Sequence, residues 1–264
     1  MGILNVTPDS FSDGARYLDK NKAINHAVQM AQDGADIIDI GGESTRPGSI
    51  PITIEEELQR VIPVIKELSK QINIPISIDT YKSKVAKAAI DSGASIINDI
   101  SAFHFDPKMA GLAASTEVPV ILMHIKGTPK DMQNNPDYRD LFSEIIDYLN
   151  DGIKIALQAG VSKYKIIIDP GIGFGKTFQH NIKIIQNLNR FKRLDKPILI
   201  GVSRKAFIGA ILDNAPAQER LIGSVSTALI CAMNGANILR VHDVKETVQS
   251  LKILKAFHEQ PSKV

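Results

Sequence analysis

Short runs of β-branched apolar residues alternate with longer stretches of helical periodicity along the whole chain. Apolar runs bounded by turn residues are typical of buried strands. Apolar positions three and four residues apart are typical of helices that pack on a sheet. The pattern predicts eight strands, at 2–7, 36–42, 75–80, 95–100, 119–124, 165–171, 197–203 and 238–244.

A predicted helix follows each strand, and several helices carry clear end signals. Thr53 is a typical N-cap followed by acidic residues, and Gly34 is a typical residue just beyond a helix C-terminus. The order glycine, small residue, strand occurs three times, in DGADIID, SGASIIND and NGANILR. The predicted helices occupy 21–34, 53–71, 81–93, 106–115, 138–160, 179–191, 219–235 and 244–260.

Eight strand-helix units predict a parallel sheet covered on one face by helices. Eight such units close naturally into a (β/α)8 TIM barrel, so we expect a single α/β domain over residues 1–264. An open, doubly wound sheet is the alternative. That fold usually carries a glycine fingerprint after its first strand, and the chain has NVTPDS there.

The composition agrees with a globular enzyme, with 44% apolar and 23% charged residues. A net charge of +2 without a long Lys/Arg run argues against a nucleic-acid partner. The N-terminus lacks the regions of a signal peptide, and no apolar run approaches the roughly 20 residues of a membrane span. The single Cys231 excludes an intramolecular disulfide framework, which favours a reducing cytoplasm.

Polar residues stand at the predicted carboxyl end of every strand, where barrel enzymes place their active sites. Turn formation alone would explain Asp, Asn, Ser or Thr at any one end, but not the Arg and Lys residues. The strand ends carry Asn5; GGESTRPGS; Asp79 and Thr80; Asn98 and Asp99; Met123 and His124; Asp169 with PGIGFGK; Ser203, Arg204 and Lys205; and Arg240, His242 and Asp243.

These residues fall into two chemical groups. Asp79, Asn98 and Asp169 suit a flat heterocycle rich in N–H groups, because a carboxylate accepts two donors from an amidine-like edge. Cationic side chains suit phosphate or carboxylate oxygens, and Asn5 offers a neutral oxygen to a hard cation such as Mg²⁺. The residues therefore predict an enzyme for a heterocycle with an anionic, phosphorylated group. The cationic candidates are Arg46, Arg204, Lys205, Arg240 and His242.

The GIGFGK segment, residues 171–176, superficially resembles a phosphate-binding glycine loop. It lacks the spacing of a Walker motif, so we expect a mobile strand-to-helix turn whose Phe174 packs on a ligand. No Cys/His cluster in the sequence offers a zinc site.

Eight segments together resemble the dihydropteroate synthase family of bacterial folate biosynthesis: NVTPDSFSDG, GGESTRPG, ISIDT, IINDIS, LMH, IIIDPGIGFGK, VSRK and RVHDV. The match runs in order over essentially the whole chain. Members condense 6-hydroxymethyl-7,8-dihydropterin diphosphate with p-aminobenzoate, giving 7,8-dihydropteroate and diphosphate with Mg²⁺ as cofactor, and the resemblance implies this reaction here. Relatives usually carry several residues before the corresponding Met, so the first strand is expected to be short.

The resemblance also implies roles for single residues. Phe11, Ser12 and Asp13 would form a mobile loop that closes over diphosphate and helps to form the p-aminobenzoate pocket. Asn5 would be the Mg²⁺ ligand. The pterin would be bound by Asp79, Asn98, Met123, Asp169, Phe174 and Lys205; p-aminobenzoate by Thr45, Arg46, Pro47 and Ser203; and diphosphate by Asn5, Thr45, Arg240 and His242. The catalytic set would be Asp79, Lys205, Arg240 and His242.

Two other functions are weighed against this one. Pterin-binding methyltransferases share the barrel and a similar Asp/Asn/Asp trio, but would not be expected to carry ESTRPG or the diphosphate residues. A catalytically silent pterin-binding homologue is the second alternative, and four intact residues argue against it: Asn5, Lys205, Arg240 and His242. The family resemblance further implies sulfonamides as inhibitors and a homodimer formed through the helices at 217–235 and 244–258.

Overall fold

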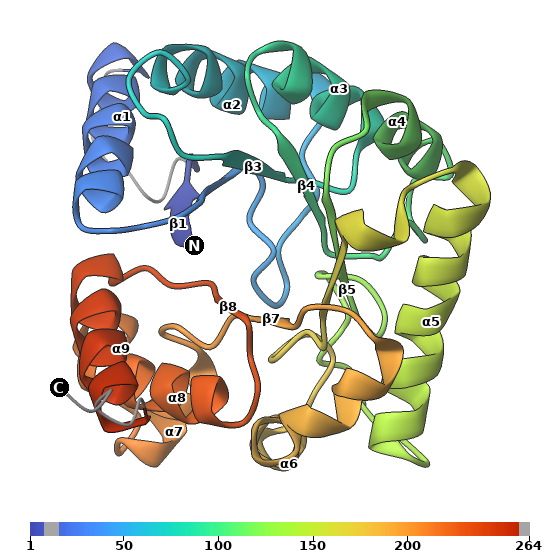
Figure 1. The fold of residues 1–264 in the computed structure, drawn as a ribbon, viewed down its shortest axis with the longest axis vertical. Coiled ribbons are helices and arrows are strands. Elements are labelled where there is room, and N and C mark those ends of the chain that lie inside the picture. The colour runs from blue at the N-terminus through green and yellow to red at the C-terminus, as the bar shows by residue number, and fades with distance from the viewer. Residues whose placement is uncertain (8–15, 259–264) are drawn as a thin grey trace, which may run out of the picture.

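The computed structural model describes residues 1–7 and 16–258, and its helices form a ring around central strands (Figure 1). Strands and helices alternate as the sequence predicts. The strands are β1 (Gly2–Asn5), β2 (Ile38–Gly41), β3 (Ile76–Asp79), β4 (Ile96–Asp99), β5 (Val120–Met123), β6 (Ile166–Asp169), β7 (Leu199–Ile200) and β8 (Ile238–Leu239). The α-helices are α1 (Arg16–Gln32), α2 (Ile54–Leu68), α3 (Ser83–Asp91), α4 (Met109–Thr116), α5 (Leu141–Ala159), α6 (Phe178–Gln186), α7 (Ala206–Ile211), α8 (Leu221–Met233) and α9 (Val244–His258).

All strand pairs are parallel, as the β-α alternation requires. Strands β1 to β6 pair in chain order, and β7 pairs with β8. Isolated bridges join the two sheets on both sides, between Gly2 and Val241 and between Ile168 and Ile198. The eight strands thus form the expected α/β barrel, with its ladder interrupted on either side of the β7–β8 pair.

Strands β7 and β8 are much shorter than the predicted runs at 197–203 and 238–244. After β7 the chain closes a turn, in which the Lys205 N–H donates to the Val202 carbonyl at 3.2 Å. After β8, the Val241 N–H donates to the Met1 carbonyl at 3.0 Å, across to the start of the chain. Strands β7 and β8 therefore end early, and the loops that follow them carry polar residues.

The barrel interior is apolar at its base. Because strand side chains alternate between two faces, every second residue points away from the helices. The base is filled by a cluster of buried residues separate from the large core between strands and helices: Met1, Ile96, Ile121 and Leu199.

Two residues further along three of the strands, the side chain on the same face becomes polar. Asn98 follows Ile96, Asp169 follows Ile167, and Arg240 follows Ile238. Asn98 and Asp169 are both buried. The interior thus changes from apolar to charged within one step of the strand alternation.

Three helices end in the same way before a strand, confirming the repeated sequence pattern. Gly34, Gly93 and Gly235 all have positive φ, at 98°, 116° and 107°. The next N–H reaches back to a carbonyl five residues earlier in each case, as Ala35 does to Met30 at 2.9 Å. This is a Schellman-type end, which favours glycine. Thr53 also caps α2 as expected, accepting from the Glu56 N–H at 3.1 Å.

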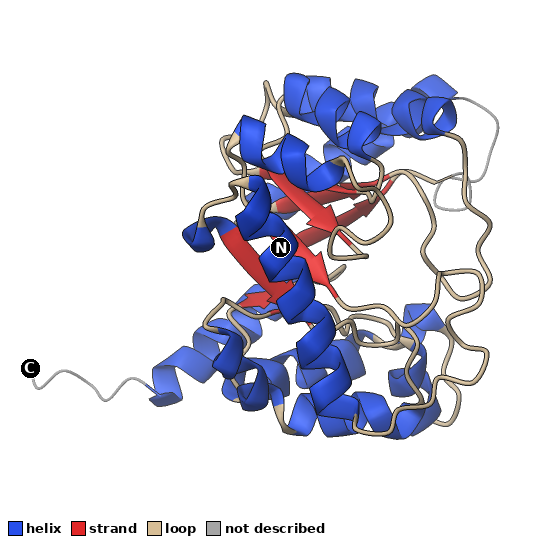
Figure 2. Cartoon of the chain, turned by 90° about the vertical axis from the view of Figure 1, so that its right-hand side faces the viewer, coloured by secondary structure: helices blue, strands red, loops and turns tan. Residues whose placement is uncertain are grey.

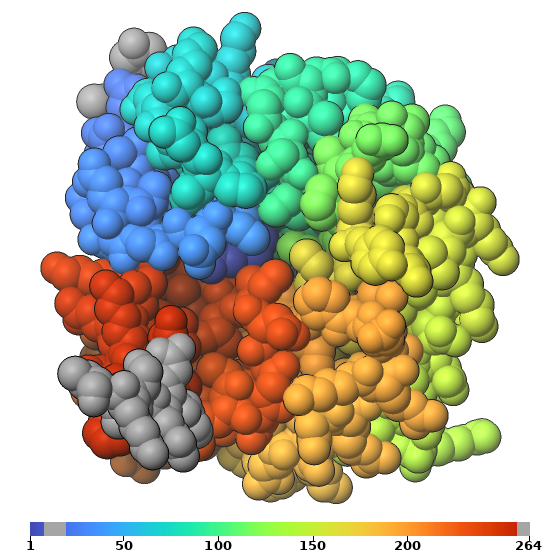
Figure 3. Space-filling model, in the orientation of Figure 1, coloured from blue at the N-terminus to red at the C-terminus, as the bar shows by residue number. Residues whose placement is uncertain are grey.

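Several long connections follow strands, as at 42–53 after β2 and 124–140 after β5. The long loops, drawn in tan in Figure 2, accordingly gather along one side of the barrel. The first and last described segments lie side by side in Figure 3, in agreement with the Gly2–Val241 bridge. Helix α7, which lies between β7 and α8, was not predicted. Helix α1 begins earlier than the predicted residue 21.

Candidate active site

The strand register places three predicted residues at one level of the barrel. Asn5 on β1 is paired with Gly41 on β2, Gly41 with Asp79 on β3, and Asp79 with Asn98 on β4. On the next pair of strands, Met123 is opposite Asp169. Parallel pairing therefore gathers these residues on one rim, as the sequence predicts.

Arg240 reaches from the end of β8 across this rim to two carboxylates. Its Nε is 2.6 Å from Asp39 Oδ2, and its Nη2 is 2.7 Å from Asp79 Oδ2. The Asn98 amide also donates to Asp39 Oδ2, at 3.1 Å. Four side chains from four strands thus form one hydrogen-bonded ion cluster inside the barrel.

Asp39 is a functional candidate that the sequence reasoning missed. It is fully buried, and its Oδ1 has no hydrogen-bond partner among the described residues. The sequence predicts a strand at 36–42 there, with candidate site residues only after it. Strand alternation gives a usable signal, because Asp39 lies on the same strand face as Ile37 and Gly41. An Asp inside an apolar run is rarely buried without a charged neighbour.

The buried, charged surroundings of Asp79 shift its pKa upward. Burial raises the pKa of Asp79, the Arg240 guanidinium opposes that shift, and the Asp39 carboxylate adds to it. One guanidinium thus serves two carboxylates in a place where neither is well solvated.

Lys205 and Phe174 are brought together as predicted. The Lys205 ammonium lies 4.6 Å from the centre of the Phe174 ring and donates to the Ile172 carbonyl. Burial lowers the pKa of Lys205 to about 8, although the charge of Asp169 opposes the shift. Asp169 itself accepts from the Gly171 N–H at 2.7 Å, and burial raises its pKa.

The GIGFGK turn, expected from the sequence to be mobile, is joined by hydrogen bonds to two other segments. Its carbonyls at Gly173 and Gly175 accept from Gln133 and Tyr138, each at 2.8 Å, and the Gly173 N–H donates to Asn181 Oδ1, also at 2.8 Å. Sequence periodicity could not show this, because the partners come from segments on both sides of the turn.

The two candidate residues at the end of β5, Met123 and His124, contact different partners. Met123 packs in a buried cluster that Phe174 also contacts. His124 instead faces Lys176, with 2.8 Å between its Nδ1 and the lysine Nζ. Burial lowers the pKa of both His124 and Lys176 well below their usual values, and the positive charge of Lys176 lowers that of His124 further.

Ser203 and His242 lie side by side at the ends of β7 and β8. The Ser203 hydroxyl is 3.0 Å from His242 Nδ1 and accepts from the His242 N–H at 3.2 Å. Burial lowers the pKa of His242 to about 4, helped by the charges of Arg240 and Arg204. His242 is therefore a neutral imidazole near pH 7, rather than the cation expected from the sequence.

Arg204 is occupied by a local partner. Its guanidinium forms a two-point ion pair with Asp243, including a 3.1 Å bond from Nε to Oδ2. It thus ties the loops after β7 and β8 together, which differs from the anion-binding role suggested by its charge.

Thr45, Arg46 and Pro47 lie in the loop between β2 and α2. Arg46 and Pro47 are exposed and Thr45 is half-buried. Arg46 is near enough to contribute to the low pKa of His242, so the loop lies beside the β8 end. The predicted loop residues Phe11, Ser12 and Asp13 lie outside the described residues.

Within residues 1–7 and 16–258, no group of three His, Cys, Asp or Glu side chains could hold a metal ion. Asn5 is half-buried at the end of β1. A single amide oxygen fits Mg²⁺, which usually keeps several waters and takes further oxygens from substrate phosphates. The donor set therefore fits a metal that a phosphorylated substrate helps to hold.

Two further sequence expectations concern location. The thiol of Cys231 is free and buried. Among the described helices, none is both long and apolar enough to cross a membrane.

Replacing Asp39 by Ala should lower the free energy of unfolding by about 3 kcal/mol, because the buried guanidinium of Arg240 loses one of its two carboxylates. Urea denaturation followed by circular dichroism would measure the change. Asp91→Ala is the matched control, since it removes an exposed ion pair with Lys87 and should cost less than about 1 kcal/mol. Equal losses in the two variants would contradict the role assigned to Asp39.

The chain is similar to known proteins over nearly its full length. Residues 1–242 match the family of pterin binding enzymes. The dihydropteroate synthase of Escherichia coli strain K12 is 48% identical over 256 residues, which cover 97% of this chain and 90% of the relative. That of Bacillus subtilis is 48% identical over 259 residues, covering 97% and 87%.

Solved structures agree in fold and in name. Dihydropteroate synthase of Xanthomonas albilineans with 4-aminobenzoic acid has a TM-score of 0.93 and 43% identity, covering 98% of this chain and 93% of that one. The Yersinia pestis enzyme in a sulfonamide drug complex has a TM-score of 0.91 and 46% identity, covering 97% and 92%.

These relatives are named for one activity, the synthase reaction, and not for methyl transfer. The predicted α/β barrel and the predicted transferase chemistry are both confirmed by these likenesses. The chain therefore belongs to the family of pterin binding enzymes and has dihydropteroate synthase activity.

Proposed function

We propose that the inward-facing rim of the barrel binds the pterin. The observation that carries this proposal is the gathering of two carboxylates and an amide, Asp79, Asn98 and Asp169, at the ends of β3, β4 and β6 on one rim. Such a set accepts hydrogen bonds from the amino and ring N–H groups of a pterin. The Phe174 ring and the Lys205 ammonium, 4.6 Å apart, close one side of the pocket. Met123 supplies apolar contact beneath them.

The diphosphate would lie between Asn5, Thr45, Arg240 and His242. Arg240 is committed to Asp39 and Asp79 in this structure. When substrate binds, its guanidinium exchanges the Asp79 carboxylate for diphosphate oxygens, and Asp79 is left to the pterin. The neutral His242 donates a hydrogen bond to the same group, and a bound dianion raises its pKa.

The reaction needs one bond broken and one formed. The bond between the pterin CH₂ group and the diphosphate oxygen breaks, and its electron pair leaves with diphosphate. The electron-rich dihydropterin stabilises the cation that remains, and the Asp79 carboxylate favours it electrostatically. The amine of p-aminobenzoate then forms the C–N bond and releases a proton to solvent. Arg240 neutralises the charge that grows on the leaving group.

Mg²⁺ is the proposed cofactor, with Asn5 as its protein ligand. When bound, it would supply further positive charge at the diphosphate. Asn5 fits this role because it offers a neutral oxygen at the level of Asp79 and Asn98.

The second substrate, p-aminobenzoate, would contact Thr45, Arg46, Pro47 and Ser203. The exposed Arg46 suits its carboxylate. Sulfonamides would compete at this site, a proposal supported by the related Yersinia pestis structure with a sulfonamide drug complex. Closure of Phe11, Ser12 and Asp13 over the bound substrates belongs to the same proposal.

Asp169→Ala should abolish pterin binding, because the pterin N–H groups lose the carboxylate that accepts from them. Isothermal calorimetry with a dihydropterin ligand would measure this, and at least about a hundredfold loss of affinity is expected for a buried charged hydrogen bond. Asp91→Ala, on the exposed surface of α3, serves as the control. Unchanged affinity in Asp169→Ala would remove this residue from the pterin site.

Asn5→Ala should raise the Mg²⁺ concentration needed for half-maximal diphosphate release by about tenfold, as expected for a lost oxygen ligand. The assay uses dihydropterin diphosphate, p-aminobenzoate and increasing Mg²⁺ after treatment with a chelator. An identical Mg²⁺ dependence in Asn5→Ala and the unchanged enzyme would refute Asn5 as the ligand.

We also propose a homodimer formed through α8 and α9. Both helices expose large apolar side chains, and clusters of this kind on a surface mark contact sites. The exposed residues are Ile222, Ile230, Met233, Ile253 and Phe257, with Phe257 at 86%.

Analytical ultracentrifugation at micromolar concentration should therefore show a dimer, and Ile253→Glu should shift it to monomer because a charge would be buried in the contact. Ile50→Glu, at an exposed position outside α8 and α9, should leave the dimer intact. A monomeric unchanged chain would contradict the proposal.

The proposed location is the reducing cytoplasm, where the thiol of Cys231 would stay free.

A further inference from the structure

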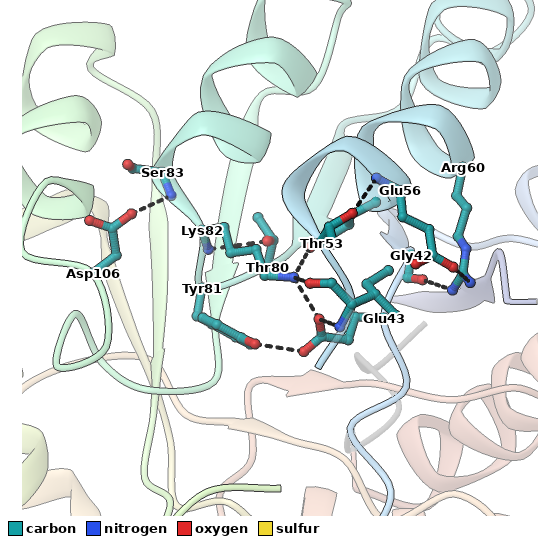
Figure 4. Close-up of polar contacts among 12 residues, drawn as sticks. Gly42, Glu43, Thr53, Glu56, Arg60, Thr80, Tyr81, Lys82, Ser83 and Asp106 are labelled. Carbon is teal, nitrogen blue, oxygen red and sulfur yellow. Dashed lines mark hydrogen bonds and ion pairs between the residues drawn. The ribbon is translucent and has the colours of Figure 1, made fainter. Parts of the chain in front are cut away.

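A buried charged cluster lies behind the loop that carries Thr45, Arg46 and Pro47. Figure 4 shows its side chains converging from the β2–α2 loop, from α2 and from the segment after β3. The Lys82 ammonium is at the centre, 2.6 Å from Glu43 Oε2 and 2.7 Å from Glu57 Oε2. We call Glu43, Glu57, Tyr81 and Lys82 the loop clamp.

The clamp joins both ends of the loop. Glu43, near its start, accepts from the Ile52 N–H at 3.0 Å, and Ile52 is near its end. Lys82 donates to the Ile52 carbonyl at 2.9 Å while it contacts Glu43. One carboxylate and one ammonium thus set the distance between the two ends of the exposed segment 44–51.

Tyr81 fixes the second oxygen of the same carboxylate. Its hydroxyl donates to Glu43 Oε1 at 2.7 Å, and its ring packs edge-on against Phe105 with centroids 5.4 Å apart. The carboxylate of Glu43 is therefore held at both oxygens and cannot rotate without losing several bonds. Its side chain is 6% exposed, so water could not easily replace them.

The clamp is anchored in the strand that carries Asp79. Tyr81 and Lys82 follow Asp79 by two and three residues, and the Lys82 N–H donates to Thr80 Oγ1 at 3.2 Å. The position of the loop is thus tied to the strand end that bears the pterin carboxylate. None of the four clamp side chains is among the residues assigned to either substrate.

We propose that Tyr81 and Lys82 are positioning residues for p-aminobenzoate: through Glu43 they hold Thr45 and Arg46 where the second substrate binds. The inference rests on the proposed contacts of that loop. It implies that the affinity for the aryl carboxylate depends on residues that never touch it. Among the proposed diphosphate contacts only Thr45 lies in this loop, and none of the proposed pterin contacts does.

Tyr81→Phe tests this most directly, because it removes one hydroxyl and keeps the ring against Phe105. We expect the KM for p-aminobenzoate, and the inhibition constant of a sulfonamide, to rise about fivefold, as for the loss of one hydrogen bond. The KM for dihydropterin diphosphate and kcat should stay within about twofold, since Thr45 is the only one of the four proposed diphosphate contacts that lies in this loop. Lys82→Met should raise the KM for p-aminobenzoate further. Lys82→Arg, which keeps the positive charge, should raise it much less than Lys82→Met does.

Tyr148→Phe is the matched control. It also removes a half-buried hydroxyl with a 2.8 Å bond, in this case to the Ser101 carbonyl, and should leave the KM for p-aminobenzoate unchanged. A double-mutant cycle with Arg46→Ala adds a second readout. If the clamp acts through the loop, Tyr81→Phe should have little further effect once Arg46 is gone.

Two results would overturn the inference. One is an unchanged KM for p-aminobenzoate in Tyr81→Phe, with Arg46→Ala strongly impaired; this result leaves the substrate site standing. The other is an unchanged KM in Arg46→Ala itself, which removes the loop from the substrate site and the clamp with it. If Lys82→Met does not fold, Tyr81→Phe and its control still decide.

Discussion

The ion cluster of Asp39, Asp79 and Arg240 joins the end of the barrel to its beginning. Arg240 follows the two-residue strand β8, at the place where the ladder between the last and first strands is reduced to an isolated bridge. Its guanidinium reaches β2 and β3 from there, across 201 and 161 residues of sequence. The arrangement of the rim depends on this contact, because Asp79 and Asn98 both take part in the same cluster.

This arrangement links stability to binding. A buried guanidinium without carboxylates would be costly, and Arg240 lies between two of them. In the proposed reaction diphosphate would replace the Asp79 carboxylate at Arg240, and the pterin would take Arg240's place at Asp79. The apolar base of the barrel, around Ile96 and Ile121, keeps water from the other side of the cluster.

Much of the fold could be predicted from the sequence because its signals are local. Apolar runs indicated all eight strands, and the three glycine-terminated helix ends have the conformation that the repeated pattern predicts. The rim residues could be predicted because each apolar run is followed directly by polar residues, which marks the end of the strand. Asp39 was missed because it lies within an apolar run, at 36–42, where polar residues were expected only after the strand.

Contacts between distant segments could not be predicted in the same way. The neutral state of His242 follows from burial and from two arginines on neighbouring loops. The hydrogen bonds of the GIGFGK turn come from donors such as Gln133 and Tyr138, about forty positions away. Lys82 lies in the predicted helix at 81–93, but its side chain is only 12% exposed because Glu43 and Glu57 pack against it.

The interrupted ladder has a consequence for how the barrel can deform. Strands β7 and β8 are joined to the six-stranded sheet by isolated bridges, while the other strands share continuous ladders. Ser203, Lys205, Arg240 and His242 all belong to this pair of strands or follow it directly. A widening of the barrel along these two seams would leave its continuous ladders intact. It would move the cationic residues together, relative to the carboxylates of β2, β3 and β6, and would be resisted at one seam by the contacts of Arg240.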